Sequence, residues 1–183
     1  MEQGILEIDR LYKSLLNGEG GYLRQEADQV GIEQKLVMLF VYSSAKPSIS
    51  ANAGKLSQHL LSPDAWEKNI CPVCGNAPGL ATIAGQGQRY FYCSFCWTKW
   101  RVQRMLCAFC QNEDHTKLHY FFSEAEPEYR VDMCDQCGKY LKTVDIRKID
   151  RVFYAPLEQV STLHLDMKAV EMGDQNPMQI YSQ

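Results

Sequence analysis

Apolar residues recur at helical spacing in the first third of the chain. In residues 5–16 they fall three or four positions apart, and the glycines at 18, 20 and 21 end that segment. A second apolar segment, residues 32–44, stops before Lys46-Pro47, since a residue preceding proline disfavours the helical conformation. Residues 50–61 predict a third helix, and Ser62-Pro63 opens a short one through Trp66. We expect these apolar faces to pack in the core of a helical N-terminal domain, residues 1–69.

The pattern changes to short β-rich segments in the middle of the chain. The expected strands are residues 79–84, 88–92, 117–122, 129–133 and 140–146. Glycine-rich or acidic turn segments separate them. The strands predict two hairpins, and the order of elements suggests an internal duplication.

Helical spacing returns near residue 156. Leu157, Val160, Leu163, Met167 and Val170 form an apolar stripe, which Gly173 closes. We expect one C-terminal helix that packs back on the β-rich part, followed by a polar tail. His164 falls on the same stripe, which indicates a packed or interfacial residue more than a metal ligand.

All eight cysteines lie in the β-rich part, in four C-x2-C pairs. Two residues between the cysteines allow a tight turn to direct both sulfurs at one ion, with backbone N–H groups donating to the sulfurs. Gly75 and Gly138 follow the second cysteine of their pairs, where the turn needs a positive φ angle that glycine adopts without strain. The motif at residues 71–75, CPVCG, is typical of a rubredoxin or zinc-ribbon knuckle.

The spacing between pairs predicts which cysteines share an ion. Eighteen residues separate the first two pairs, and 23 separate the last two, so each interval fits a hairpin. The ten residues between the second and third pairs suit a connector. We therefore prefer sequential pairing to an interleaved arrangement. Site 1 comprises Cys71, Cys74, Cys93 and Cys96, and site 2 comprises Cys107, Cys110, Cys134 and Cys137.

These elements together predict an α+β protein. It consists of a helical N-terminal domain, two tandem rubredoxin-like or zinc-ribbon domains at residues 70–105 and 106–150, and a C-terminal helix with its tail at 151–183. Tetrahedral sulfur ligation suits iron and zinc equally, so we expect two metal ions, Fe or Zn. A shell of four cysteines leaves no open position for a substrate, which argues against hydrolytic metal catalysis.

Composition and charge reduce the number of plausible functional classes. The chain is 45% hydrophobic and 22% charged, with a formal net charge of −3, and this acidic balance disfavours non-specific binding to nucleic acid. The N-terminal segment lacks the apolar core of a secretory signal, and no apolar segment is long enough to span a membrane. We expect a cytoplasmic protein, in which reduced thiols favour metal ligation over disulfides. The sequence carries no phosphate-binding loop, nucleophile elbow or carboxylate pair, so we do not expect an enzyme.

A basic and aromatic segment surrounds the second cysteine pair. Trp97, Trp100, Arg101 and Arg104 are candidates for a partner-binding surface, and Arg89 and Lys99 lie near them in sequence. One interpretation is a nucleic-acid surface. The preferred interpretation is that the tryptophans cover the metal site and the cations offset its negative charge.

Five motifs follow one another from about residue 66 to 177: CPVCGNAPG, RYFYCSFCWTKW, LCAFC, VDMCDQCGKYLK and STLHLDM. This ordered series resembles the FdhE family of formate dehydrogenase accessory proteins. The resemblance implies two rubredoxin-like sites, the eight cysteines as ligands and iron as the usual metal. Tyr140, Leu141 and Lys142 match the motif after the last knuckle, and Leu165 and Asp166 match the closing helix. Family members have a longer helical N-terminal region than the roughly 70 residues before Cys71.

The resemblance implies a maturation chaperone that binds the catalytic subunit of a formate dehydrogenase, or of a related molybdenum or tungsten enzyme, and assists its assembly. Two alternatives stay open. One is a double zinc ribbon that binds nucleic acid, and the other is a rubredoxin-like electron carrier, a role compatible with that of the chaperone.

Overall fold

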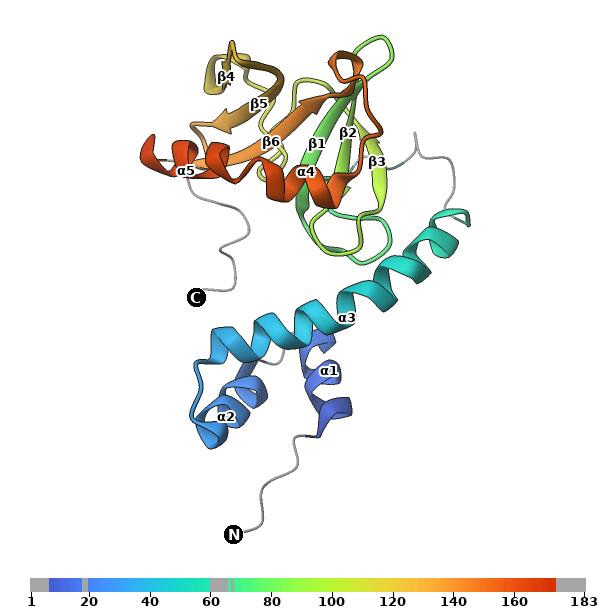
Figure 1. Ribbon diagram of the computed structural model, residues 1–183, viewed down its shortest axis with the longest axis vertical. Helices are drawn as coiled ribbons and strands as arrows, with labels where there is room; N and C mark the ends of the chain where they lie inside the picture. Colours follow the sequence, from blue (N-terminus) through green and yellow to red (C-terminus); the bar gives the residue numbers. More distant parts are fainter. Residues whose placement is uncertain (1–6, 18–19, 60–65, 67, 174–183) are drawn as a thin grey trace.

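The computed structural model describes residues 7–17, 20–59, 66 and 68–173. The N-terminal part contains helices α1 (Ile8–Asn17), α2 (Gly20–Val30) and α3 (Gln34–Ser57). Their core consists of Leu11, Leu23, Ala27, Val37 and Val41. In Figure 1 these helices lie at one end of the molecule, and α3 extends from them to the β-sheet. The expected short helix before Trp66 lies outside the described residues.

Helix α3 corrects the expectation of two separate helices. It runs through Pro47 without ending, so the predicted stop before Lys46-Pro47 is wrong. Proline cannot donate to the carbonyl of Ser43, and both residues lie on the exposed side of the helix. The middle of α3 contacts the core around site 1 through Tyr42, Ala45 and Ile49. This packing outweighs the local preference of proline to end a helix.

The β-rich part forms one six-stranded sheet in the order β3-β2-β1-β6-β5-β4. Its strands are β1 (Pro78–Ala84), β2 (Gln88–Cys93), β3 (Lys99–Val102), β4 (Leu118–Ser123), β5 (Glu126–Cys134) and β6 (Lys139–Asp145). The five expected strands are present, and β3 is an additional strand that the sequence pattern did not predict. Short 3-10 helices at His115–Lys117 and Ile146–Lys148 precede β4 and follow β6.

Strands β1 and β6 join the two ribbons. They pair in parallel, with Ala81 opposite Thr143 and Ile83 opposite Asp145, whereas every other pair in the sheet is antiparallel. The two ribbons therefore share a continuous sheet. The expected domain boundaries after residues 69, 105 and 150 stay predictions.

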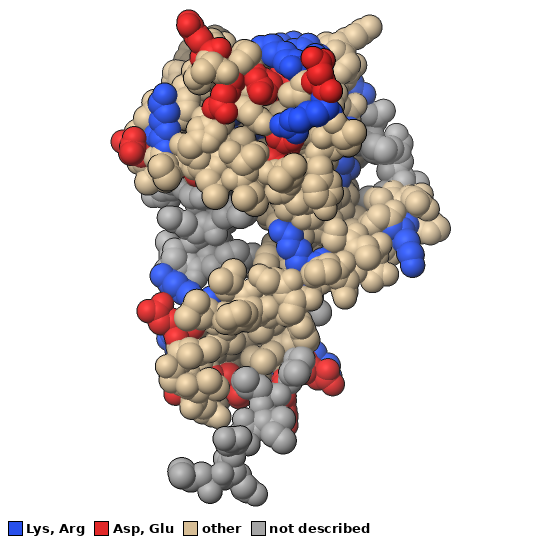
Figure 2. Space-filling view, viewed as in Figure 1, with Lys and Arg blue, Asp and Glu red and all other residues tan. Residues whose placement is uncertain are grey.

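The C-terminal part forms two short helices, α4 (Ala155–Ser161) and α5 (Leu163–Glu171), instead of one. They lie along one face of the sheet (Figure 1). The apolar stripe of the sequence is exposed, with Leu157 58% and Met167 65% accessible. The buried residues are Ala155, Glu158, Thr162, Leu165 and Ala169. Figure 2 shows a largely uncharged surface over these helices.

Two buried polar clusters hold these helices on the sheet. The ammonium group of Lys142, on β6, donates to Asp166 Oδ2 at 2.7 Å, and Tyr140 Oη donates to Asp166 Oδ1 at 3.0 Å. On α4, Glu158 is fully buried and accepts hydrogen bonds from Tyr129 and Arg151. Buried charges are tolerated only when they are paired in this way. These contacts give structural roles to Tyr140, Lys142 and Asp166, whose sequence motifs had no assigned role.

None of the described helices has the length and apolar character needed to cross a membrane.

Candidate metal centres

The four cysteine pairs form turns with a common backbone geometry. In the first pair, the N–H of Gly75 donates to the carbonyl of Cys71 at 3.0 Å, and the N–H of Cys71 donates to Asn76 at 2.8 Å. The third pair repeats both bonds, with Gln111 and Asn112 in the places of Gly75 and Asn76. In the fourth pair, Gly138 donates to Cys134 at 2.8 Å. The duplication expected from the sequence is therefore visible in the backbone of the knuckles.

The residue after the second cysteine has a positive φ angle in all four knuckles. The angles are 75° at Gly75, 60° at Trp97, 59° at Gln111 and 61° at Gly138. Trp97 and Gln111 carry a Cβ atom and occupy this left-handed region at an energetic cost. The geometry of the turn therefore dictates the backbone conformation even where glycine is absent.

Replacing Gly138 with alanine is expected to destabilise the protein by about 1 kcal/mol. No atom lies within 4 Å of a Cβ built at this position, so the expected cost arises from the positive φ angle alone. Denaturant unfolding of the metal-loaded protein measures this cost. Gly54→Ala in helix α3, which also meets no atom, is the matched control and should be neutral or stabilising. Equal destabilisation by both substitutions would contradict the argument.

Site 1 brings together the four cysteines that the sequence assigned to it. The Sγ atoms of Cys71 and Cys96 are 3.5 Å apart, and those of Cys74 and Cys93 are 3.3 Å apart. Three of the four cysteines are buried, and Cys74 is half-buried. The site is part of a hydrophobic core that also contains Phe91, Phe95 and Trp100.

Site 2 brings together the other four cysteines in the expected combination. The Sγ atoms of Cys107 and Cys137 are 3.7 Å apart, as are those of Cys110 and Cys134. Cys107 and Cys134 are buried, whereas Cys110 and Cys137 are half-buried. None of the described histidines belongs to either group; His119 and His164 instead contact Asp135 and Glu126, each at the surface.

Donors surround the sulfur atoms in both sites. The backbone N–H groups of Val73 and Phe95 lie 3.4 Å from Cys71 Sγ and Cys93 Sγ, and Phe109 N–H lies 3.4 Å from Cys107 Sγ. The hydroxyl of Thr98 lies 3.0 Å from Cys96 Sγ. Donors directed at sulfur stabilise the thiolate form, which is the form that binds a metal.

Close packing of the thiols separates their pKa values. Contacts with the other three thiols lower the pKa of Cys96 and raise the pKa of Cys93. Contacts with Cys71 and Cys93 lower the pKa of Cys74 to about 7, and burial raises the pKa of Cys107 to about 11. Four adjacent thiols cannot all ionise unless a cation balances their charge.

The donor set fits a tetrahedral metal ion. A tetrahedron with metal–sulfur distances of about 2.3 Å places its sulfur atoms roughly 3.8 Å apart. In each group the sulfurs lie within 4.8 Å of one another, and the cysteines form no disulfide. Each group could therefore hold one ion, and four thiolates would complete its coordination shell.

The candidate partner-binding residues occupy different environments. Trp100 is only 2% exposed and meets Phe91 edge-on in the core, so its assignment to a partner-binding surface is wrong. Trp97 is half-buried beneath the ammonium group of Lys46. Arg101 and Arg104 are exposed. The burial of Trp100 beside the cysteines agrees with the interpretation that it covers the metal site.

Sequence reasoning missed the contribution of α3 to site 1. Lys46 Nζ donates to the carbonyl of Ser94 at 3.1 Å, and Ser50 Oγ donates to that of Cys96 at 3.3 Å. Tyr42 donates to Asn76, whose side-chain amide lies 3.6 Å from Cys74 Sγ. Asparagine recurs two residues after the second cysteine in CPVCGN and CAFCQN, a signal that could have indicated the role of Asn76.

Comparisons with known proteins agree with this geometry. Residues 70–104 match the family model described as FdhE, central domain. A protein FdhE homolog of Aquifex aeolicus is 32% identical over 148 residues, which are 78% of this chain and 50% of that protein. The chain is a relative of the FdhE proteins.

Two further matches define the extent of the FdhE resemblance. Protein FdhE of Escherichia coli is 33% identical over 111 residues, covering 58% of this chain and 35% of that protein. The crystal structure of FdhE from Pseudomonas aeruginosa shares the fold, with a TM-score of 0.65 and 22% identity over 91% of this chain and 66% of that one. The chain spans half or less of the length of these sequence relatives.

Proposed function

We propose that the chain is an accessory protein that binds the catalytic subunit of a formate dehydrogenase in the cytoplasm and assists its assembly. The observation that carries the proposal is the presence of two four-cysteine groups within a fold shared with FdhE. The relatives named FdhE support the same role. The proposal includes a related molybdenum or tungsten enzyme as the client.

The chemistry of the cysteine groups supports a role without catalysis. An ion held by four thiolates has no open position for a substrate or an activated water molecule. Each group instead closes a ribbon and connects it to the shared sheet. We propose that all eight cysteines are ligands of two ions, Fe or Zn, and that these ions stabilise a surface for the client.

Charge supports a protein client over nucleic acid. The net charge is −3, and Arg89, a member of the basic segment, is buried and paired with Asp132 at 2.8 Å. Its charge is therefore not available to phosphate groups.

Affinity purification from the native cells tests the proposal. The tagged chain is expected to recover the catalytic subunit of a formate dehydrogenase, identified by mass spectrometry, from cells that are synthesising that enzyme. A second tagged protein with zinc ribbons, unrelated in sequence, is the control for non-specific capture. Repeated failure to recover any molybdenum or tungsten enzyme subunit would contradict the proposal.

A further inference from the structure

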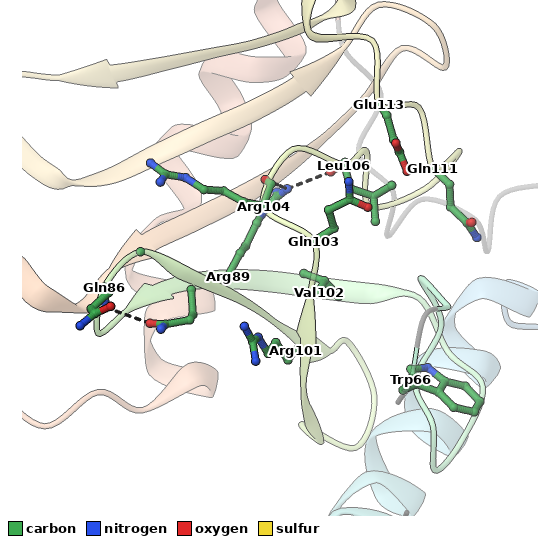
Figure 3. Close-up of a pocket in the computed structure, with 12 residues that line it drawn as sticks. Trp66, Gln86, Arg89, Arg101, Val102, Gln103, Arg104, Leu106, Gln111 and Glu113 are labelled. Atoms are coloured by element: carbon green, nitrogen blue, oxygen red, sulfur yellow. Dashed lines mark hydrogen bonds between the residues drawn. The ribbon is translucent and has the colours of Figure 1, made fainter. Parts of the chain in front are cut away.

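A cavity of about 880 Å³ opens beside the exposed edge strand β3. Its walls come from the β1–β2 turn, β2, β3 and the segment at residues 103–113, with Trp66 at one end (Figure 3). The lining is dominated by arginine and glutamine. The lining residues are Trp66, Gln86, Gly87, Gln88, Arg89, Arg101, Val102, Gln103, Arg104, Leu106, Gln111 and Glu113.

The cavity carries an excess of positive charge. Arg89 is 4% exposed, and its guanidinium group is held by Asp132 and by the carbonyl of Leu106, each at 2.8 Å, so its charge is already balanced. Arg101 and Arg104 are exposed, and Figure 3 shows them on β3 and on the segment that follows it. Among the lining residues, Glu113 is the one acid. The balance favours an anionic ligand.

The glutamines and the edge strand suit a peptide. Four glutamine amides line the cavity, and a primary amide can donate to and accept from a peptide backbone. Among the described residues, strand β3 pairs only with β2, so its other edge faces away from the sheet and can pair with an extended segment. Both features favour an extended polypeptide over a compact small anion.

A second cavity of about 240 Å³ adjoins the first and shares Arg89, Arg104 and Leu106 with it. Phe109, Leu118, Tyr120 and Met133 contribute apolar surface to its lining. The first cavity is therefore rich in arginine, and the second combines an apolar part with Arg130, Lys139 and two cysteines of site 2. One extended ligand could contact both.

We propose that the two adjoining cavities form a docking site for an extended segment of a protein partner, with a carboxylate side chain next to a large apolar one. The carboxylate pairs with Arg104, because guanidinium and carboxylate groups form bidentate hydrogen bonds. The apolar side chain enters the second cavity. This inference rests on the proposed function as a partner-binding protein.

Fluorescence anisotropy on the metal-loaded full chain tests the docking site. The probes are a labelled peptide in which glutamate alternates with leucine, the same peptide with glutamine in place of glutamate, and a labelled single-stranded DNA. The acidic peptide is expected to bind roughly tenfold or more tightly than its glutamine counterpart, and to weaken as salt is raised. Equal binding of the two peptides, or stronger binding of the DNA, would overturn the proposal.

Substitutions locate the binding within the cavity. Arg104→Glu is expected to weaken binding of the acidic peptide roughly tenfold or more. Arg104→Ala provides a milder variant with a lower risk to folding, since Arg89 contacts only the backbone carbonyl of Arg104. Lys35→Glu, at an exposed position of α3, is the matched charge-reversal control and should bind like the unmodified chain. Unchanged affinity of folded Arg104 variants would place the peptide elsewhere and overturn the proposal.

Two outcomes separate this inference from the proposed function. Recovery of the formate dehydrogenase subunit by both the unmodified chain and the Arg104 variants would exclude the docking site while the proposed function stands. Arg104-dependent binding of the acidic peptide, without recovery of any such subunit, would support the docking site and contradict the proposed client.

Discussion

Replacing Cys96 with serine is expected to remove one of two bound metal ions and to unfold the sheet around site 1. A structural four-cysteine site contributes on the order of 10 kcal/mol at neutral pH, which is comparable to the total stability of a domain. Cys96 is 2% exposed and shares its core with Phe91 and Trp100. Loss of the ion would therefore leave unpaired thiols in the centre of that core.

Metal analysis together with near-ultraviolet circular dichroism measures both effects. Cys137→Ser at site 2 is the matched control, because Cys137 is only half-buried and does not belong to the core around site 1. It should also lose one ion, but with less change in the tryptophan signal than Cys96→Ser. Retention of two ions by folded Cys96→Ser protein would contradict the proposed coordination.

Metal analysis of the unmodified protein also identifies the bound metal. Protein purified without air from cells supplied with iron and zinc is expected to contain two ions per chain. Iron held by four thiolates would give charge-transfer bands in the visible spectrum, and a reversible potential would support an additional redox role. Zinc gives no such bands, and the two sites would then have only a structural role. Fewer than two ions in well-folded protein would contradict the proposal that all eight cysteines are ligands.

Replacing Lys142 with methionine is expected to destabilise the folded protein by about 3 kcal/mol or more. The ammonium group is buried and binds Asp166 Oδ2 at 2.7 Å and the carbonyl of Gln159 at 2.9 Å. Methionine has a similar volume but provides no charge, so Asp166 would lose its ion-pair partner in a site that is 15% exposed. The contact between α5 and β6 should weaken first.

Denaturant unfolding and hydrogen exchange in α5 measure the effect of Lys142→Met. Lys148→Met makes the same chemical change at an exposed position and should cost less than about 0.5 kcal/mol. Adding Asp166→Leu to Lys142→Met removes the unpaired carboxylate and should recover part of the lost stability. Similar stability of the Lys142 and Lys148 variants would show that the buried pair does not hold the helix.

The metal-centre geometry could be predicted from the sequence because its determinants are local. Two residues between cysteines define each knuckle, and the hairpin lengths brought the correct pairs together. Five strands were also predicted correctly, because the glycine-rich or acidic turns that separate them are recognisable in the local sequence. Strand β3 was missed because its four residues, KWRV, were interpreted as part of a basic and aromatic segment around the second cysteine pair.

The remaining differences arise from contacts between distant parts of the chain. No local signal indicates that Pro47 lies inside a helix, because the contacts that maintain α3 involve residues around site 1. In the C-terminal part, Thr162 separates two helices and changes which residues face the sheet. Glu158 is buried because Tyr129 and Arg151 bind it, a contact that hydrophobic patterning cannot reveal. In each of these cases, contacts between residues far apart in the sequence determine the local structure.

The parallel pairing of β1 with β6 has a consequence for synthesis on the ribosome. Strand β1 and both cysteine pairs of site 1 leave the ribosome well before β6, which is among the last parts of the sheet to be made. Until β6 arrives, one edge of β1 has no partner, and an open edge can pair with another nascent chain. Early capture of metal at site 1 would order the first ribbon during this interval. Metal supply during translation should therefore affect the yield of soluble protein more strongly than metal added after synthesis.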